Sequence, residues 1–375
     1  MKSNYKKLGQ YIRQVDVRNT EGKEENLLGV SVQKQFIPSI ANTVGTDFTK
    51  YKVVRKGQFT YIPDTSRRGD KIGIALLEDY DEGLVSNVYT VFEVIDENQL
   101  MPEYLMLWFS RPEFDRYARF KSHGSVREVM DWDEMCKVEL PVPSIEEQRS
   151  IVKAYKAITD RIVLKKRIND NLEATLRAIY KEFFTAESND DLPTGWKIAP
   201  FSEVATVIMG QSPEGDDCNN EEIGDPLLNG PTEFGFYSPT PVQWTTNGKK
   251  YCVDGDLLFC VRGSTTGRMN WANQSYAIGR GLATIRHKMD ISLNWFIKAM
   301  IDNSLQEILA AATGSTFPNV GKDLLNGFLV TIPDNQTLCK FGKRGQAISV
   351  MIANNAKEID ALMVLQKSLL SQLSR

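Results

Sequence analysis

The feature that most constrains this chain is a long-period internal repeat. Gly57-Gln-Phe-Thr-Tyr-Ile62 resembles Gly255-Asp-Leu-Leu-Phe-Cys260, and each segment reads as a polar turn followed by a buried strand. Further along, Val138-Glu-Leu-Pro-Val-Pro143 matches Phe328-Leu-Val-Thr-Ile-Pro333. Because the order and the spacing of the matches are preserved, the chain is predicted to contain two copies of one module.

A long helical pattern follows the proline that ends each copy. Its apolar residues recur at steps of three and four, and the two ladders superimpose when the copies are aligned. The predicted seam residues are Ile151, Tyr155, Ile158, Ile162, Leu172, Leu176, Ile179 and Phe183 in the first copy, and Ile348, Ile352, Ile359, Leu362, Leu369 and Leu373 in the second. A sustained period of about 3.5 residues is typical of a coiled coil, so the two helices are predicted to pair with each other, antiparallel, within the chain. Two unrelated core helices are the alternative.

Four polar residues interrupt the predicted seams: Lys165, Asn169, Asn355 and Gln366. Such residues weaken a seam but can fix its register and orientation.

Four segments are expected: a first domain over 1–144, a central helix over 145–187, a second domain over 188–333 and a C-terminal helix over 334–375. The polar, Pro- and Gly-containing stretch 185–195 ends the first helix. Strands are predicted at 27–32, 58–62, 72–76, 89–94, 256–261, 283–286 and 327–332, and shorter helices at 103–109, 113–120 and 293–312. Because strands and helices do not alternate regularly, the fold class is predicted to be α+β, with two similar mixed domains separated by the helix pair.

Composition excludes several classes of protein. A hydrophobic content of 42% and a net charge of −3 over 375 residues are ordinary for a globular protein. No apolar run approaches the length of a membrane span, and the start of the chain lacks the apolar core of a signal peptide, so a cytoplasmic location is expected. With two histidines and five cysteines, none of them in a C-x-x-C pair, no metal site is predicted.

The usual catalytic motifs are missing from the sequence. There is no P-loop, no G-x-G-x-x-G between a strand and a helix, and no Asn/Asp-Pro-Pro-aromatic signature of an amino-methyltransferase. Asp131 and Asp133 are interpreted as part of a solvated turn. We therefore expect a binding or organising protein rather than an enzyme.

Four segments carry a family resemblance: Lys7-Leu-Gly-Gln-Tyr-Ile12, Leu140-Pro-Val-Pro-Ser-Ile-Glu-Glu-Gln-Arg149, Leu192-Pro-Thr-Gly-Trp-Lys197 and Gly314-Ser-Thr-Phe-Pro-Asn-Val-Gly-Lys322. With the duplicated modules and helices, the chain resembles the specificity subunit of type I restriction-modification systems over nearly its whole length. The second helix departs from the pattern, because Pro333-Asp-Asn-Gln336 lacks the Glu-Gln-Arg of the first.

The resemblance implies that each module is a target recognition domain for one half of a split DNA sequence, with the helices setting the gap between the halves. It implies two modification subunits that bind S-adenosylmethionine and methylate adenine, and restriction subunits that use ATP and Mg. This chain would bind no cofactor and have no catalytic activity. A two-headed protein-binding adaptor with a coiled-coil spacer, and an enzyme with two degenerate domains, stay open as alternatives.

Loops after strands can carry side chains that contact DNA, and Arg, Lys, Asn and Gln are the residues that read base edges in the major groove. The candidate contacts are Arg67, Arg68, Lys71, Ser125 and Arg127 in the first module; Arg262, Ser264, Thr265, Arg268, Ser315, Thr316 and Asn319 in the second; and, as lesser candidates, Lys34 and Arg280. An ordinary solvated surface charge is the alternative for any one of them. Gly263, Gly267 and Gly314 would permit positive φ or close backbone approach there. A pI near 5.7 is low for a protein that binds DNA unaided.

Overall fold

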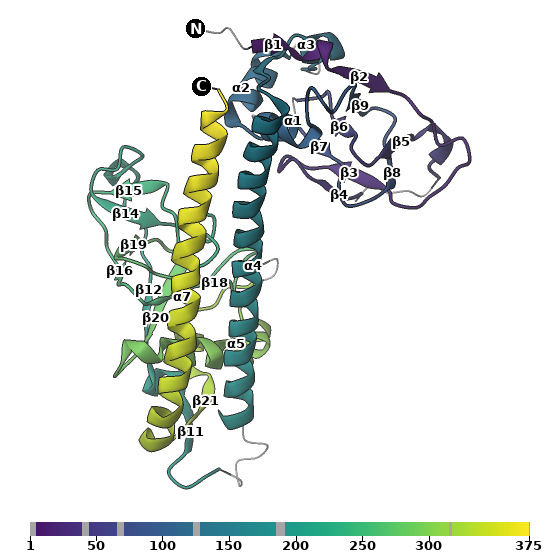
Figure 1. Cartoon of the computed structure of the whole chain (residues 1–375). Coiled ribbons are helices and arrows are strands. Elements are labelled where there is room, and N and C mark those ends of the chain that lie inside the picture. The colour runs from purple at the N-terminus through teal and green to yellow at the C-terminus, as the bar shows by residue number, and fades with distance from the viewer. Residues whose placement is uncertain are drawn as a thin grey trace. The chain divides into compact units, whose positions relative to one another are not determined.

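The computed structural model describes residues 5–39, 45–65, 71–122, 128–184, 192–314 and 317–374. The chain forms two compact units, the first comprising Met1–Arg161 with Leu362–Arg375 and the second Ile162–Ala361. The long helices α4 (Ile145–Phe184) and α7 (Asn335–Gln372) lie within the predicted helical segments (Figure 1). The units divide inside both helices and not at their ends. Each unit therefore contains one mixed α/β domain and a part of each helix. No helix in the described ranges is long and apolar enough to cross a membrane.

The first unit is organised around a four-stranded antiparallel sheet of order β2-β9-β6-β7. Its strands are β2 (Ile12–Val15), β9 (Thr90–Val94), β6 (Phe59–Tyr61) and β7 (Ile74–Leu76). Helix α1 (Pro102–Phe109) packs on the sheet through Phe109, whose ring lies edge-on to that of Phe59 at 5.8 Å between centroids. Phe59 in turn stacks on Phe92 at 4.8 Å, and all three rings are fully buried.

The second unit repeats this topology. Its sheet has the order β12-β20-β17-β18, again antiparallel throughout. The strands are β12 (Ala205–Met209), β20 (Leu282–His287), β17 (Leu257–Cys260) and β18 (Met269–Trp271), and α5 (Asn294–Ala310) takes the place of α1. Gly57 and Gly255, which the repeat aligns, both precede the corresponding strand with φ of 83°. The predicted duplication is therefore present in the fold.

A short antiparallel ribbon closes each domain where its long helix begins. In the first unit β1 (Tyr5–Lys7) pairs with β10 (Glu139–Pro141), and in the second β11 (Lys197–Pro200) pairs with β21 (Leu329–Ile332). The two segments that the repeat matches at 138–143 and 328–333 are thus the strands that lead into α4 and α7.

The remaining elements are more divergent between the units. In the first they are η1 (Leu8–Gln10), β3 (Leu28–Val30), β4 (Phe36–Pro38), η2 (Phe48–Lys50), β5 (Lys52–Arg55), β8 (Glu82–Val85), α2 (Pro112–Lys121) and α3 (Trp132–Cys136). In the second they are η4 (Phe201–Glu203), η5 (Gly215–Asp217), β13 (Cys218–Asn219), β14 (Asp225–Leu228), β15 (Gln243–Thr245), β16 (Tyr251–Cys252), β19 (Tyr276–Ile278), η6 (Ile291–Leu293) and α6 (Lys322–Gly327). The second unit combines five of these strands into a further sheet of order β13-β15-β14-β19-β16, which the sequence did not predict. In the first unit the pairs β3-β4 and β5-β8 are linked by a parallel bridge between Leu27 and Leu84.

The polar seam residues bond across the helix pair. In the second unit Lys165 Nζ donates to Asn355 Oδ1 at 2.8 Å, and Asn355 Nδ2 donates to Asn169 Oδ1 at 2.8 Å. In the first unit Gln366 Nε2 donates to Thr159 Oγ1 at 2.9 Å. Because residue numbers rise along α4 as they fall along α7, the helices pair antiparallel within each unit. A one-turn slip would leave these buried groups without partners, so they hold the register.

The predicted seam residues are mostly shielded from solvent. Buried or half-buried positions are Ile151, Tyr155, Ile158, Ile162, Leu172, Leu176, Ile179, Ile348, Ile352, Ile359, Leu362, Leu369 and Leu373. Phe183 is 38% exposed, although its ring lies 4.2 Å from that of Phe341 on α7. Tyr180 and Phe184 were not predicted, yet both are buried against Phe296 of the second domain. The end of α4 therefore uses two faces, one for α7 and one for the domain.

The two long helices begin with different caps. At α4, Gln148 is fully buried and connects three backbone groups, since its Nε2 donates to Gln99 O and Pro143 O and its Oε1 accepts from Met101 N. At α7, the carboxylate of Asp334 accepts from Thr337 N at 3.0 Å and from Trp196 Nε1 at 3.0 Å. The departure from Glu-Gln-Arg at the second helix is thus matched by another cap, and the Leu-Pro-x-Gly-Trp motif provides its indole partner.

Candidate DNA-recognition site

Each unit brings together the two loops that the sequence analysis selected. In the second unit the loop after β17 meets the segment before α6, because Arg262 forms a β-bridge with Asn319 and Val320 N donates to Val261 O at 2.8 Å. We call this arrangement the two-loop site. The first unit has the same arrangement: Asp64 forms a β-bridge with Val129, and Thr65 N donates to Glu128 O at 2.9 Å.

Glycines shape the two-loop site of the second unit. Gly263, Gly267 and Gly314 have φ of 92°, 91° and 121°, which confirms the predicted positive-φ positions. At Gly314 a Cβ would lie 2.2 Å from Phe317 O, so this loop turns too closely for a side chain there. Thr266 Oγ1 lies 2.7 Å from Gly263 O and 2.9 Å from Pro318 O and so connects the loops. The described backbone of the site is therefore constrained by these turns and bonds.

The predicted side chains of this site face solvent. Arg262, Ser264, Thr265, Arg268 and Asn319 are all exposed. In the described ranges, no carboxylate forms an ion pair with Arg262, Arg268 or Arg280. Arg268 lies 5.8 Å from the ring centroid of Phe234 and reaches Pro231 O at 3.5 Å, so its stem is supported while its charge stays accessible. Exposed guanidinium groups without carboxylate partners are suited to phosphate or guanine.

Arg280 joins the same edge from a third segment. It lies in the turn between β19 and β20, is exposed, and is next to Gly281, whose O accepts from Val261 N at 3.0 Å. In the first unit Lys71 is exposed on the segment that leads into β7. The other predicted contacts, Arg67, Arg68, Ser125, Arg127, Ser315 and Thr316, lie outside the described residues.

The structure corrects the prediction that Lys34 contacts DNA. Only 7% of its side chain is exposed, and its Nζ lies 2.6 Å from Asp115 Oδ1. Asp115 Oδ1 also accepts from Ile72 N at 3.2 Å, so the ion pair connects the β3–β4 turn, the segment before β7 and α2. Burial lowers the pKa of the Lys34 ammonium from its usual value. Lys34 is therefore a structural residue and is not placed to contact DNA. The hydrophilic character of a lysine could not indicate this burial.

Sequence reasoning also missed two polar residues beside the two-loop site of the second unit, Asn229 and Gln243. They belong to β14, β15 and their flanks, where the sequence analysis found no repeat match. The repeat was the signal that identified the other loops, and its sequence matches did not extend to the segments that hold Asn229 and Gln243.

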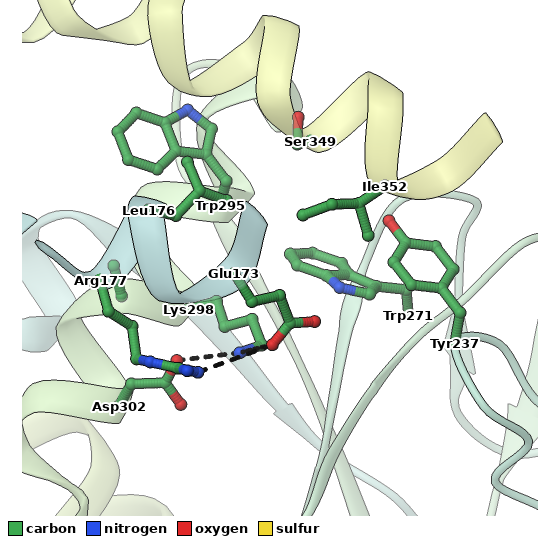
Figure 2. A pocket seen from close by; sticks show the side chains of 11 residues that line it. Glu173, Leu176, Arg177, Tyr237, Trp271, Trp295, Lys298, Asp302, Ser349 and Ile352 are labelled. Carbon is green, nitrogen blue, oxygen red and sulfur yellow. Dashed lines mark hydrogen bonds and ion pairs between the residues drawn. The ribbon is translucent and has the colours of Figure 1, made fainter. Parts of the chain in front are cut away.

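A small cavity of the second unit lies between α4, α5 and α7 (Figure 2). Trp271, Trp295 and Tyr237 line it, and Lys298 forms ion pairs with Glu173 at 3.3 Å and Asp302 at 2.9 Å. These charges compensate one another, so none of them is left to bind a ligand. We interpret the cavity as part of the packing between the helices and the domain. In the described ranges no cluster of three His, Cys, Asp or Glu residues is placed to hold a metal.

Known proteins resemble this chain in sequence. Residues 3–174 match the family model of the type I restriction modification DNA specificity domain. The putative type I restriction enzyme MjaX specificity subunit of Methanocaldococcus jannaschii is 24% identical over 341 residues, which cover 87% of this chain and 79% of that protein. The chain is thus similar to type I restriction-modification specificity subunits over most of its length. The MjaIX specificity subunit of the same organism is also 24% identical, over 302 residues that cover 75% of this chain and 70% of its own.

A solved structure of this family shares the fold. The type I restriction-modification S subunit from M. genitalium aligns over 99% of this chain and 96% of its own, with a TM-score of 0.56 at 13% identity. The matched specificity domain and the specificity-subunit relatives support sequence-specific DNA recognition by the chain. None of these matches supports a protein-binding adaptor without a DNA role.

Proposed function

We propose that this chain is the non-catalytic recognition subunit of a type I complex, and that each unit reads one half of a bipartite DNA target. The observation that carries this proposal is the repeated two-loop site: the same pair of loops meets on the same sheet topology in both units. The side chains in the two sites differ, with Arg262 and Asn319 in one and Asp64 and Val129 in the other. Equivalent frames with different side chains suit two different half-sites.

The helix pair is proposed to set the spacer between the half-sites and to dock two modification subunits, with restriction and translocase subunits joining them in the cytoplasm. S-adenosylmethionine, ATP and Mg would be bound by those partners. The charge of the chain supports a shared interface, since a net charge of −3 provides little phosphate affinity by itself. We infer that the partner subunits contribute part of the phosphate contacts.

The test compares the pure chain with the complex. The chain is incubated with S-adenosylmethionine and random-sequence duplex DNA, alone and with its modification subunit, and methylated adenines are mapped. We expect no methyl transfer by the chain alone and adenine methylation at a bipartite sequence with the partner. Methyl transfer by the pure chain would contradict the proposal. Partner binding that DNA neither requires nor alters would support the adaptor alternative.

A further inference from the structure

An amide pair stands beside the two-loop site of the second unit. Asn229 directly follows β14 and Gln243 opens β15, and Asn229 Nδ2 donates to Gln243 Oε1 at 2.7 Å. This bond leaves Asn229 Oδ1 as an acceptor and Gln243 Nε2 as a donor, and neither atom has a hydrogen-bond partner among the residues that the structure describes. Asn229 is exposed and Gln243 is half-buried. The pair thus lies at the surface with one donor and one acceptor that bond to no described residue.

A glycine-rich turn holds Asn229 in place. A Cβ on Gly279 would lie 2.5 Å from Asn229 Oδ1, and a Cβ on Gly281 would lie 2.4 Å from Asn229 O. The turn therefore contacts Asn229 with no side chain between them. Gly279 N also donates to Leu228 O at 2.8 Å, and a Cβ on Gly210 would lie 2.2 Å from Gly279 O on the other side of the turn. Such close backbone packing fixes the amide before a ligand arrives.

The same turn places the amide pair next to cations. Arg280 is exposed between the two glycines. Its backbone N donates to Ser212 Oγ at 3.2 Å, and this bond restrains the turn. Val261, which precedes Arg262, donates to Gly281 O at 3.0 Å. Arg268 reaches Pro231 O, two residues beyond Asn229. The amide pair, Arg280 and the two-loop site therefore form one continuous surface.

We propose that Asn229 and Gln243 together read the major-groove edge of an adenine in the half-site of the second unit. Adenine presents N7 as an acceptor and the N6 amino group as a donor, which an amide donor and an amide acceptor match. Gln243 Nε2 donates to N7, Asn229 Oδ1 accepts from N6, and Arg280 contacts a neighbouring phosphate. The inference rests on the proposed function, since it requires this unit to read DNA. A purely structural cross-strand pair between β14 and β15 is the competing explanation.

The variant that separates these explanations is Gln243→Glu. It keeps the size of the side chain and an acceptor for Asn229 Nδ2, but it removes the donor for N7. A carboxylate accepts from the N4 amino group of cytosine, so the preference at this position is expected to move from adenine toward cytosine. Asn229→Ala removes the acceptor for N6 and is the second variant. Asn247→Ala is the matched control, because this exposed amide bonds to Asp217 beyond the other end of β15.

The experiment uses the full chain in complex with its modification subunits and a duplex library randomised in both half-sites. Methylation is read for every sequence, and thermal unfolding of each variant chain is measured. At one position of the second unit's half-site, distinct from the methylated base, we expect Gln243→Glu and Asn229→Ala to lose adenine discrimination by about ten- to a hundredfold. The other half-site and Asn247→Ala should match the wild type.

An unchanged adenine preference in both variants would overturn the inference. A uniform loss at every position of the half-site would also overturn it, because that result indicates a structural pair. If Gln243→Glu fails to fold, Asn229→Ala decides between these outcomes. A wild-type complex that methylates without any bipartite preference would reject the proposed function itself, and this result is distinct from loss of one base preference in the variants.

Discussion

At the scale of single residues, the proposed function predicts that the loop arginines contribute to recognition of the half-site that each unit reads. Arg262→Ala with Arg268→Ala is expected to weaken or relax recognition of one half-site only, because a lost bidentate contact costs roughly 1–3 kcal/mol, or about ten- to a hundredfold. The counterpart is Arg67→Ala with Arg68→Ala, which should affect the other half-site. Methylome sequencing of strains carrying each double variant provides the measurement. Changes in the same half-site by both variants, or in neither, would place the contacts elsewhere.

A second residue-scale prediction concerns His287, which is buried on β20. Its Nδ1 accepts from Met289 N and Asp290 N, both at 3.2 Å, so this nitrogen must be unprotonated in the fold. Burial lowers the pKa of the imidazole from 6.5, although the nearby Asp290 raises it in part. Because the folded pKa lies below the unfolded one, the folded state binds fewer protons. The stabilisation is then complete above about pH 6.5 and is lost as the pH falls through the folded pKa.

Urea unfolding of the chain at pH 7.5 and 5.5 measures this effect. One such proton changes the free energy of unfolding by at most about 1.4 kcal/mol per pH unit. His287→Asn keeps an acceptor near the position of Nδ1 but does not titrate, so its pH dependence over this interval should be smaller than that of the wild type. An equal pH dependence of the two proteins would show that His287 does not titrate as described.

At the scale of elements, glycines in α7 bring the helix onto α5. A Cβ on Gly345 would lie 2.0 Å from Trp295 Cε2 and 2.1 Å from Cζ2, so the indole lies against the helix backbone. A Gly→Ala substitution within a helix normally raises the free energy of unfolding by up to about 1 kcal/mol. Here Gly345→Ala should instead destabilise the chain by about 1–3 kcal/mol, because the helices must separate.

The control for this variant is Gly327→Ala at the end of α6, where an added Cβ meets no atom within 4 Å. Urea midpoints of the two variants and the wild type provide the measurement. Gly327→Ala should be close to neutral. If Gly345→Ala were as stable as the wild type, the close contact between α5 and α7 would not be essential to the fold.

The elements also show what a sequence can predict. Helices α4 and α7 were predictable because their period extends over about ten turns, and strands such as β6 and β17 because each is a short apolar run after a turn. The five-stranded sheet was not predictable, because its strands have only two to four residues. It also contains a parallel pair, β14 with β19, between distant segments. The same limit hid Asn229 and Gln243. The prediction for Lys34 was wrong for another reason. Its burial depends on Asp115, which is 81 residues away in the sequence.

At the scale of the whole molecule, the proposed role of the helix pair predicts a change in target spacing. Seven residues in the local heptad pattern are added after Lys165 and seven more after Asn355, two residues that bond to each other across the pair. The seam phase is kept, since each helix gains one full repeat. Each helix grows by ~10.5 Å at 1.5 Å per residue, and at ~3.4 Å per base pair the spacer is expected to widen by up to about three base pairs.

The widening also rotates one half-site by roughly 100° about the DNA axis, at ~10–10.5 base pairs per turn, so a smaller increase is compatible with the proposal. The bases read in each half should stay the same because neither two-loop site is altered. Methylome sequencing of a strain carrying the lengthened subunit measures both properties. A chain with the insertion in α4 alone is the control, and it should lose activity because α7 can then match the seam of α4 on only one side of the insertion. An active complex that keeps its original spacer would show that the helices do not set the distance.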